Sequence, residues 1–125
     1  IYTLPSAWVQ SDSVILQDLA KRAAGKATEP AEKMANAEAF VREYIFGKTL
    51  SVGYASALEG ATSRQGDCTE HALLLTGIAR ALGIPARVAT GLAYVPSFGD
   101  REDVFVPHAW TEAFIDGRWV GFDAA

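Results

Sequence analysis

Residues 66–86 read GDCTEHALLLTGIARALGIPA, and this stretch decides the fold. Asp67 suits a helix N-cap, and Glu70 follows three residues later as in a capping box, so a helix is predicted to begin at Cys68. From residue 72 to residue 82 this helix is apolar almost all round, which is typical of a helix buried on most sides. The Gly-Ile-Pro that follows is predicted to end it.

The residues after this helix change to the two-residue period of a β-strand. Strands are predicted over Arg87–Val95, Val104–Ile115 and Arg118–Phe122. Asp116-Gly117, between the last two, is a strong signal for a two-residue hairpin turn. The C-terminal third of the chain therefore predicts an antiparallel sheet.

The residues before the central helix have the period of amphipathic helices. One helix is predicted from Ser13 to about Gly25 and a second from Glu29 to about Phe46. Farther along, Tyr54–Leu58 predicts one or two helical turns and Ala61–Gly66 a loop. Helices first and strands later indicate an α+β fold, in which N-terminal helices and a central buried helix pack on an antiparallel β-sheet. We expect one domain over residues 1–125, with a helical part at 1–50 and a core at 51–125.

Composition excludes several classes of function. The chain has 125 residues, is 50% hydrophobic and carries a net charge of −4, so neither nucleic acid nor an anionic membrane is the expected partner. It has no apolar run of the length of a transmembrane helix, no signal peptide and no second cysteine for a disulfide. Because it begins at Ile1 and stops after a strand-like run, we expect a domain taken from a longer protein. Export with the signal removed and a cytoplasmic location both stay open, as does the oligomeric state.

The only cysteine, Cys68, is predicted at the first position of the central helix. Free backbone N–H groups and the positive end of the helix dipole favour a thiolate there, and the thiolate is the nucleophilic form of cysteine. A lone cysteine is more often a small buried hydrophobic residue. Both interpretations stay open on Cys68 alone.

His108 and Asp123 supply the other parts of a thiol-based catalytic site. A two-residue loop at Asp116-Gly117 sets Trp110 opposite Asp123 on the neighbouring strand. His108 shares this face, so it becomes a diagonal neighbour of Asp123, with Cα atoms roughly 7–8 Å apart. A one-residue slip in register would move Asp123 to the other face. The sequence does not show whether this face meets the start of the cysteine helix.

Two alternatives use some of the same residues. His71 is a rival base, but a helix N-terminus disfavours a protonated imidazole and no carboxylate follows it, so a structural or outer-site role is favoured. Cys68, His71, His108 and Asp123 can be drawn as a zinc site, but no Cys-x-x-Cys pair is present, so no metal is expected. Trp110, on the face of His108, is expected to form a wall of the cleft.

Several motifs occur in a fixed order: GDCTEHA at 66–72, RALGIPARV at 80–88 with Gly91, HAWTE at 108–112, and GRWVGFDA at 117–124. Together they resemble the transglutaminase-like core, a papain-like cysteine fold, in its prokaryotic form. The resemblance covers about residues 54–125, a little over half of the chain. Ala124 stands where many relatives have proline, although prokaryotic members often have alanine.

The resemblance implies a role for each matching residue. Cys68 would be the nucleophile that forms a thioester, His108 the base that activates it, and Asp123 the residue that orients His108. The backbone N–H of Cys68 would contribute to the oxyanion hole, and Tyr54 would assist there. Neither a metal nor another cofactor is implied, and the calcium of large animal transglutaminases is not implied either.

The implied activity is acyl transfer or hydrolysis at peptide or carboxamide bonds of a peptide or protein substrate. If water resolves the thioester, the enzyme is a cysteine peptidase or amidase, which is favoured for a compact prokaryotic member. If lysine resolves it, the enzyme cross-links proteins. A non-catalytic binding module with the same fold is the alternative of another class, and the intact Cys-His-Asp set argues against it.

Overall fold

The computed structural model describes residues 1–46 and 56–125. Its helices are α1 (Val14–Ala24), α2 (Pro30–Tyr44), α3 (Ala57–Ser63) and α4 (Cys68–Ala81), and its strands are β1 (Ala86–Phe98), β2 (Arg101–Ile115) and β3 (Arg118–Phe122). The strands form one antiparallel sheet in the order β1-β2-β3. The fold is therefore the predicted α+β arrangement.

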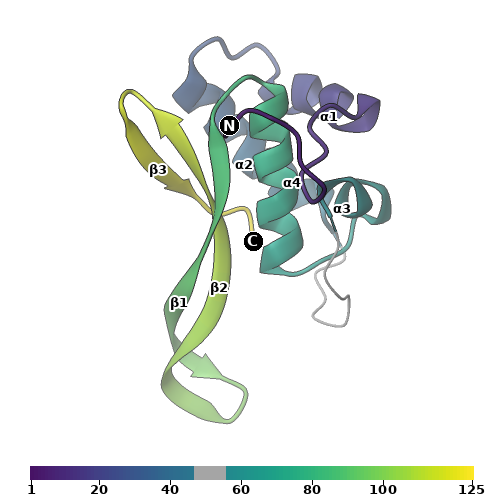
Figure 1. Ribbon diagram of the computed structural model, residues 1–125. Coiled ribbons are helices and arrows are strands. Elements are labelled where there is room, and N and C mark those ends of the chain that lie inside the picture. The colour runs from purple at the N-terminus through teal and green to yellow at the C-terminus, as the bar shows by residue number, and fades with distance from the viewer. Residues whose placement is uncertain (47–55) are drawn as a thin grey trace.

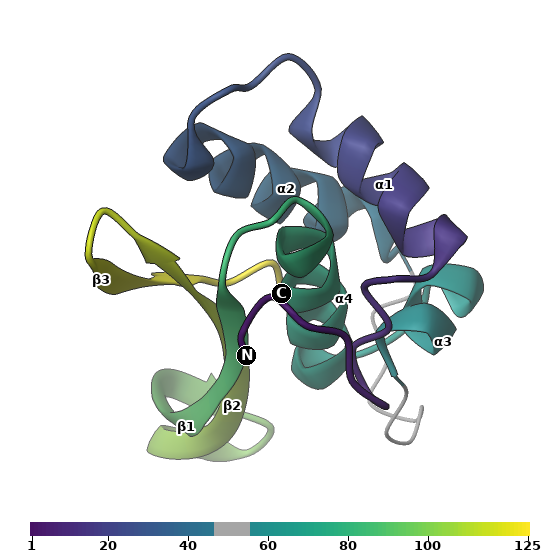
Figure 2. The same cartoon turned by 45° about the horizontal axis from the view of Figure 1, so that its top comes forward.

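Helix α4 is the centre of the molecule. The sheet packs on one side of it and the other helices lie around the rest (Figure 1), as the turned view also shows (Figure 2). Ten consecutive residues of α4, from Glu70 to Ala79, are buried. Gly77 lets its neighbours come close, because a Cβ there would lie only 3.1 Å from Leu16 Cδ1 on α1 and 3.3 Å from Ala57 Cβ on α3. The nearly all-apolar sequence of the helix thus matches its burial on all sides.

The hairpin of β2 and β3 has the register that the sequence predicts. Asp116 and Gly117 form its two-residue turn with φ angles of 52° and 80°, the left-handed conformation that such a turn requires. Ile115 pairs with Arg118, and the ladder continues to Thr111 and Phe122. This register fixes which side chains of the two strands share a face.

Strand β2 buries alternate residues against α4. The buried positions are Ala109, Thr111, Ala113 and Ile115. The Thr111 hydroxyl donates a hydrogen bond to the Ala72 carbonyl of α4 (3.0 Å) and lies 3.1 Å from the Thr76 hydroxyl. These bonds fix the position of β2 along the helix.

Several predicted boundaries are wrong by a few residues. Strand β1 begins one residue earlier than expected and extends three residues further, and β2 begins three residues earlier. Helix α2 ends at Tyr44 rather than near Phe46, because Ile45 takes extended angles (φ −85°, ψ 90°) that bury its side chain completely, and Phe46 is exposed.

The segment before α4 also differs from the prediction. Helix α3 runs through residues 61–63, which the sequence analysis assigned to a loop. It begins with a capping box in which the Ser56 hydroxyl accepts from the Glu59 N–H and the Glu59 carboxylate accepts from the Ser56 N–H. Ser-x-x-Glu is the sequence signature of such a box, so the start of this helix could have been predicted.

Candidate active site

Cys68 is the first residue of α4, as predicted, and its side chain is half-buried. The Asp67 carboxylate caps the helix by accepting a hydrogen bond from the Thr69 N–H (2.9 Å). Cys68 therefore lies at the positive end of the helix dipole.

The predicted capping box at the start of α4 is wrong for Glu70, although Asp67 is the N-cap as predicted. Glu70 turns into the core, where only 1% of the residue is exposed and its Oε1 has no hydrogen-bond partner. It packs against Gly66, where a Cβ would lie 2.3 Å from the Glu70 Cβ. Burial, together with a hydrogen bond to the Asp67 side chain and the charge of that carboxylate, raises the pKa of Glu70 to about 7.

His108 and Asp123 are in direct contact, as the predicted hairpin register indicates. His108 Nε2 lies 2.6 Å from Asp123 Oδ2. Because an ionised carboxylate only accepts hydrogen bonds, Nε2 carries the proton in this contact and Nδ1 is the nitrogen that can accept another. The geometry thus gives the imidazole the tautomer that a general base needs.

The start of α4 and His108 lie toward the same end of the helix–sheet interface. The hydrogen bond of Thr111 to Ala72 shows where β2 and α4 meet, and the two elements run in the same direction (Figure 1). His108 precedes Thr111 by three residues, roughly 10 Å along a strand, and Cys68 precedes Ala72 by four residues, roughly 6 Å along a helix. In the described part of the chain, however, no hydrogen bond joins Cys68 to His108.

Trp110 lies beside His108 on the same face of β2. The two rings are stacked, with centroids 6.0 Å apart and planes inclined by 25°. A glycine on β1 gives the indole its space, because a Cβ at Gly91 would come within 3.0 Å of Trp110 Cη2. A Cβ at Gly121 on β3 would lie 3.7 Å from Cδ1, an ordinary contact distance. The predicted position of Trp110 beside the imidazole is confirmed, and its role as a cleft wall stays a prediction.

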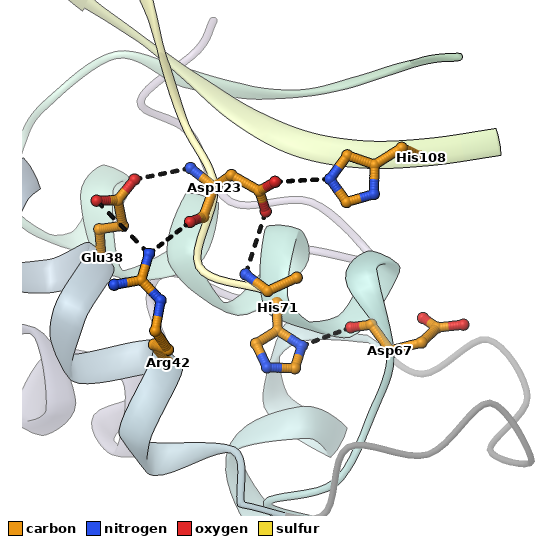
Figure 3. A network of polar contacts seen from close by, with 7 residues as sticks. Glu38, Arg42, Asp67, His71, His108 and Asp123 are labelled. Carbon is orange, nitrogen blue, oxygen red and sulfur yellow. Dashed lines mark hydrogen bonds and ion pairs between the residues drawn. The ribbon is translucent and has the colours of Figure 1, made fainter. Parts of the chain in front are cut away.

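Asp123 is held by more than His108 (Figure 3). Its backbone N–H donates to Glu38 Oε2 (2.8 Å), and its carbonyl accepts from Arg42 Nη2 (2.9 Å). Its second carboxylate oxygen, Oδ1, accepts from the Ala125 N–H (3.1 Å). Neither Glu38 nor Arg42 is among the predicted site residues, because their spacing of four residues on α2 indicates a surface ion pair but not a contact with a residue over 80 positions away.

His71 is a buried structural residue. Only 2% of it is exposed, and its Nδ1 donates to the carbonyl of Asp67, the N-cap of α4 (2.6 Å; Figure 3). This burial excludes the outer-site role. Among residues 1–46 and 56–125, no three His, Cys, Asp or Glu side chains are grouped so that they could hold a metal ion, so the four-ligand alternative is not formed there. Tyr54 lies outside the described residues.

A central helix begins with the only cysteine and packs on a sheet, where His108 of β2 contacts Asp123 just after β3; this arrangement defines a cysteine-dependent catalytic fold. The family model of the transglutaminase-like superfamily matches residues 17–124. The chain therefore belongs to the transglutaminase-like superfamily. No curated protein matches the sequence. None of the helices in the described residues is long and apolar enough to cross a membrane.

Solved structures share the fold. A "Putative Cysteine Protease" from Cytophaga hutchinsonii is 33% identical with a TM-score of 0.83, and the match covers 98% of this chain and 40% of that one. The periplasmic domain of TgpA from Pseudomonas aeruginosa, bound to ethylmercury, is 23% identical with a TM-score of 0.66, over 87% and 42% of the two chains. A protein described as a TGase is 17% identical with a TM-score of 0.67, over 92% and 31%. The present chain spans less than half the length of each of these proteins.

Proposed function

We propose that this domain hydrolyses peptide or carboxamide bonds through a thioester on Cys68, with His108 as the base and Asp123 as the residue that orients it. The contact of 2.6 Å between His108 Nε2 and Asp123 Oδ2 carries this proposal, because it leaves Nδ1 able to accept a proton. The place of Cys68 at the start of a buried helix supports the nucleophilic role.

The proposed reaction proceeds in two halves. The imidazole accepts the thiol proton of Cys68, and the sulfur attacks the carbonyl carbon while the Cys68 N–H stabilises the oxyanion. The carbon–nitrogen bond then breaks, the amine leaves with the proton from His108, and the acyl group stays on the sulfur as a thioester. Water next loses a proton to the imidazole and attacks the thioester. The carbon–sulfur bond breaks, which releases the carboxylic acid and restores the thiol.

The first test of this proposal is the pH dependence of Cys68 alkylation by iodoacetamide, in the wild type and in His108→Ala. A Cys–His pair predicts rapid labelling that persists well below pH 8 in the wild type and weakens in the variant. Ordinary thiol behaviour in both proteins would contradict the pair and would favour the non-catalytic binding module.

A substrate screen with peptides and primary amines then addresses the acyl acceptor. We expect release of a new carboxylate from a peptide or carboxamide, and complete loss of this activity in Cys68→Ala with an unchanged circular dichroism spectrum. Incorporation of the amine in preference to hydrolysis would instead indicate a cross-linking transglutaminase. Full activity in Cys68→Ala would refute the proposed role of Cys68 as the nucleophile.

A further inference from the structure

We propose that Glu38 and Arg42 of α2 are positioning residues, which set the place of Asp123 and through it the orientation of His108. This inference rests on the proposed catalytic roles of His108 and Asp123. It assigns a part in catalysis to the N-terminal helices, which carry none of the three reacting side chains.

The need for such a support follows from where β3 ends. The ladder between β2 and β3 stops at the pair of Thr111 and Phe122, so Asp123 is the first residue beyond it. A residue inside a ladder has its backbone held by the neighbouring strand. The backbone of Asp123 has lost that support at the point where its carboxylate must meet an imidazole.

Helix α2 makes the backbone hydrogen bonds that a neighbouring strand would otherwise make to Asp123. The Glu38 carboxylate accepts from the Asp123 N–H at 2.8 Å and the Arg42 guanidinium donates to the Asp123 carbonyl at 2.9 Å, so both backbone groups bond to the same helix. Glu38 and Arg42 are one helical turn apart and form an ion pair with each other at 3.9 Å. Figure 3 shows them together on one side of Asp123, with His108 on the other.

The charges match the groups they contact. An N–H bonds to a carboxylate and a carbonyl to a guanidinium, and such charge-assisted bonds are stronger than those between neutral groups. The side chains of Glu38 and Arg42 are 27% and 48% exposed. Water therefore weakens the two bonds to Asp123, and neither side chain is part of the hydrophobic core. A change at Glu38 is therefore expected to alter the site more than the fold.

The experiment compares Glu38→Ala with Glu38→Gln and with the control Glu43→Ala in the full chain. Glu43 is an exposed acidic residue of the same helix, and the described residues show no hydrogen bond or ion pair for it.

The measurement is the rate of iodoacetamide labelling of Cys68 across the pH range, with the circular dichroism spectrum as a check of folding. We expect about a tenfold slower labelling near pH 6 in Glu38→Ala, the size of one lost charged hydrogen bond. Glu38→Gln keeps an acceptor oxygen and should restore most of the rate, while Glu43→Ala should equal the wild type.

The same substitution in an Asp123→Ala background separates positioning from a general structural effect. If Glu38 acts through Asp123, Glu38→Ala should slow the labelling no further in that background. An equal loss in both backgrounds, or no loss in the wild-type background, would overturn the positioning role. Should Glu38→Ala fail to fold, Arg42→Ala in the two backgrounds gives the same test, because it removes the other bond to the Asp123 backbone.

Failure of the proposed function gives a different result. If the wild type itself shows no enhanced labelling below pH 8, the Cys–His pair is absent and both proposals fall. If the wild type is reactive and His108→Ala is not, but Glu38→Ala matches the wild type, only the positioning role is refuted.

Discussion

Replacing Glu70 with glutamine should remove much of the pH dependence of folding stability between pH 5 and pH 8. Glu70 is almost completely buried in the first turn of α4, and its Oε1 has no hydrogen-bond partner in the described residues. Glutamine has nearly the same shape but does not ionise. The substitution therefore tests the ionisation of Glu70 rather than its packing.

The size of the effect follows from the raised pKa. Burial and the neighbouring Asp67 raise the pKa of Glu70 from 4.5 to about 7. Below pH 4.5 both the folded and the unfolded chain hold the proton, so this group's favourable contribution is fully present. Between pH 4.5 and pH 7 only the unfolded chain releases the proton, so stability falls as pH rises. At 1.36 kcal/mol for each pKa unit, the total loss is roughly 3 kcal/mol, or about 10 °C in Tm for a domain of this size.

Urea unfolding of the wild type and Glu70→Gln at a series of pH values would measure this difference. We expect the two proteins to differ by about 1 kcal/mol or less near pH 5 and the variant to be about 2–3 kcal/mol more stable near pH 8. Both contain the same two histidines, so the comparison cancels their contribution. Glu32→Gln, at an exposed position of α2, is the control and should follow the wild type. Parallel curves for wild type and Glu70→Gln across this range would refute the reasoning.

Four further substitutions test the packing around the site by urea unfolding. Gly66→Ala should destabilise the fold by about 2 kcal/mol, because the new Cβ would lie 2.3 Å from a side-chain carbon of α4; wild-type stability would contradict that close packing. Thr111→Val should cost roughly 1–2 kcal/mol, because it removes two buried hydrogen-bond contacts with α4, and an unchanged midpoint would show that they contribute nothing. Gly91→Ala should cost about 1 kcal/mol and alter the near-UV circular dichroism spectrum, since the Trp110 indole must move, whereas Gly121→Ala has room and should do neither. Equal effects of the two glycine variants would contradict this account.

The contact of His108 with Asp123 could be predicted because it depends on local rules. Asp116-Gly117 specifies the loop length, the loop length specifies the register, and the two-residue period of a strand specifies which side chains share a face. Each step uses residues close together in the sequence. The same holds for the start of α4, where an N-cap aspartate precedes a continuous apolar run.

The burial of the Glu70 side chain could not be predicted from such local rules. Its spacing from Asp67 fits a capping box, and an acidic residue in the first turn of a helix is ordinarily exposed. The deciding fact is the absence of a side chain at Gly66, which lets the carboxyl group of Glu70 turn inward. A sequence pattern gives the spacing of residues along one helix, but not the space that a neighbouring segment leaves open.

The support of Asp123 by α2 is beyond sequence patterns for a further reason. Glu38 and Arg42 satisfy the rule for an ion pair four residues apart, and that rule alone accounts for their presence on a helix surface. Their bonds to Asp123 exist only because α2 and the end of β3 lie side by side, a result of how all the helices pack around α4. Local patterns therefore propose the three candidate catalytic side chains, and they predict the contact between two of them, His108 and Asp123. What holds the carboxylate in place depends on the tertiary fold, and this is why α2, whose sequence indicates a packing element, contacts the candidate active site directly.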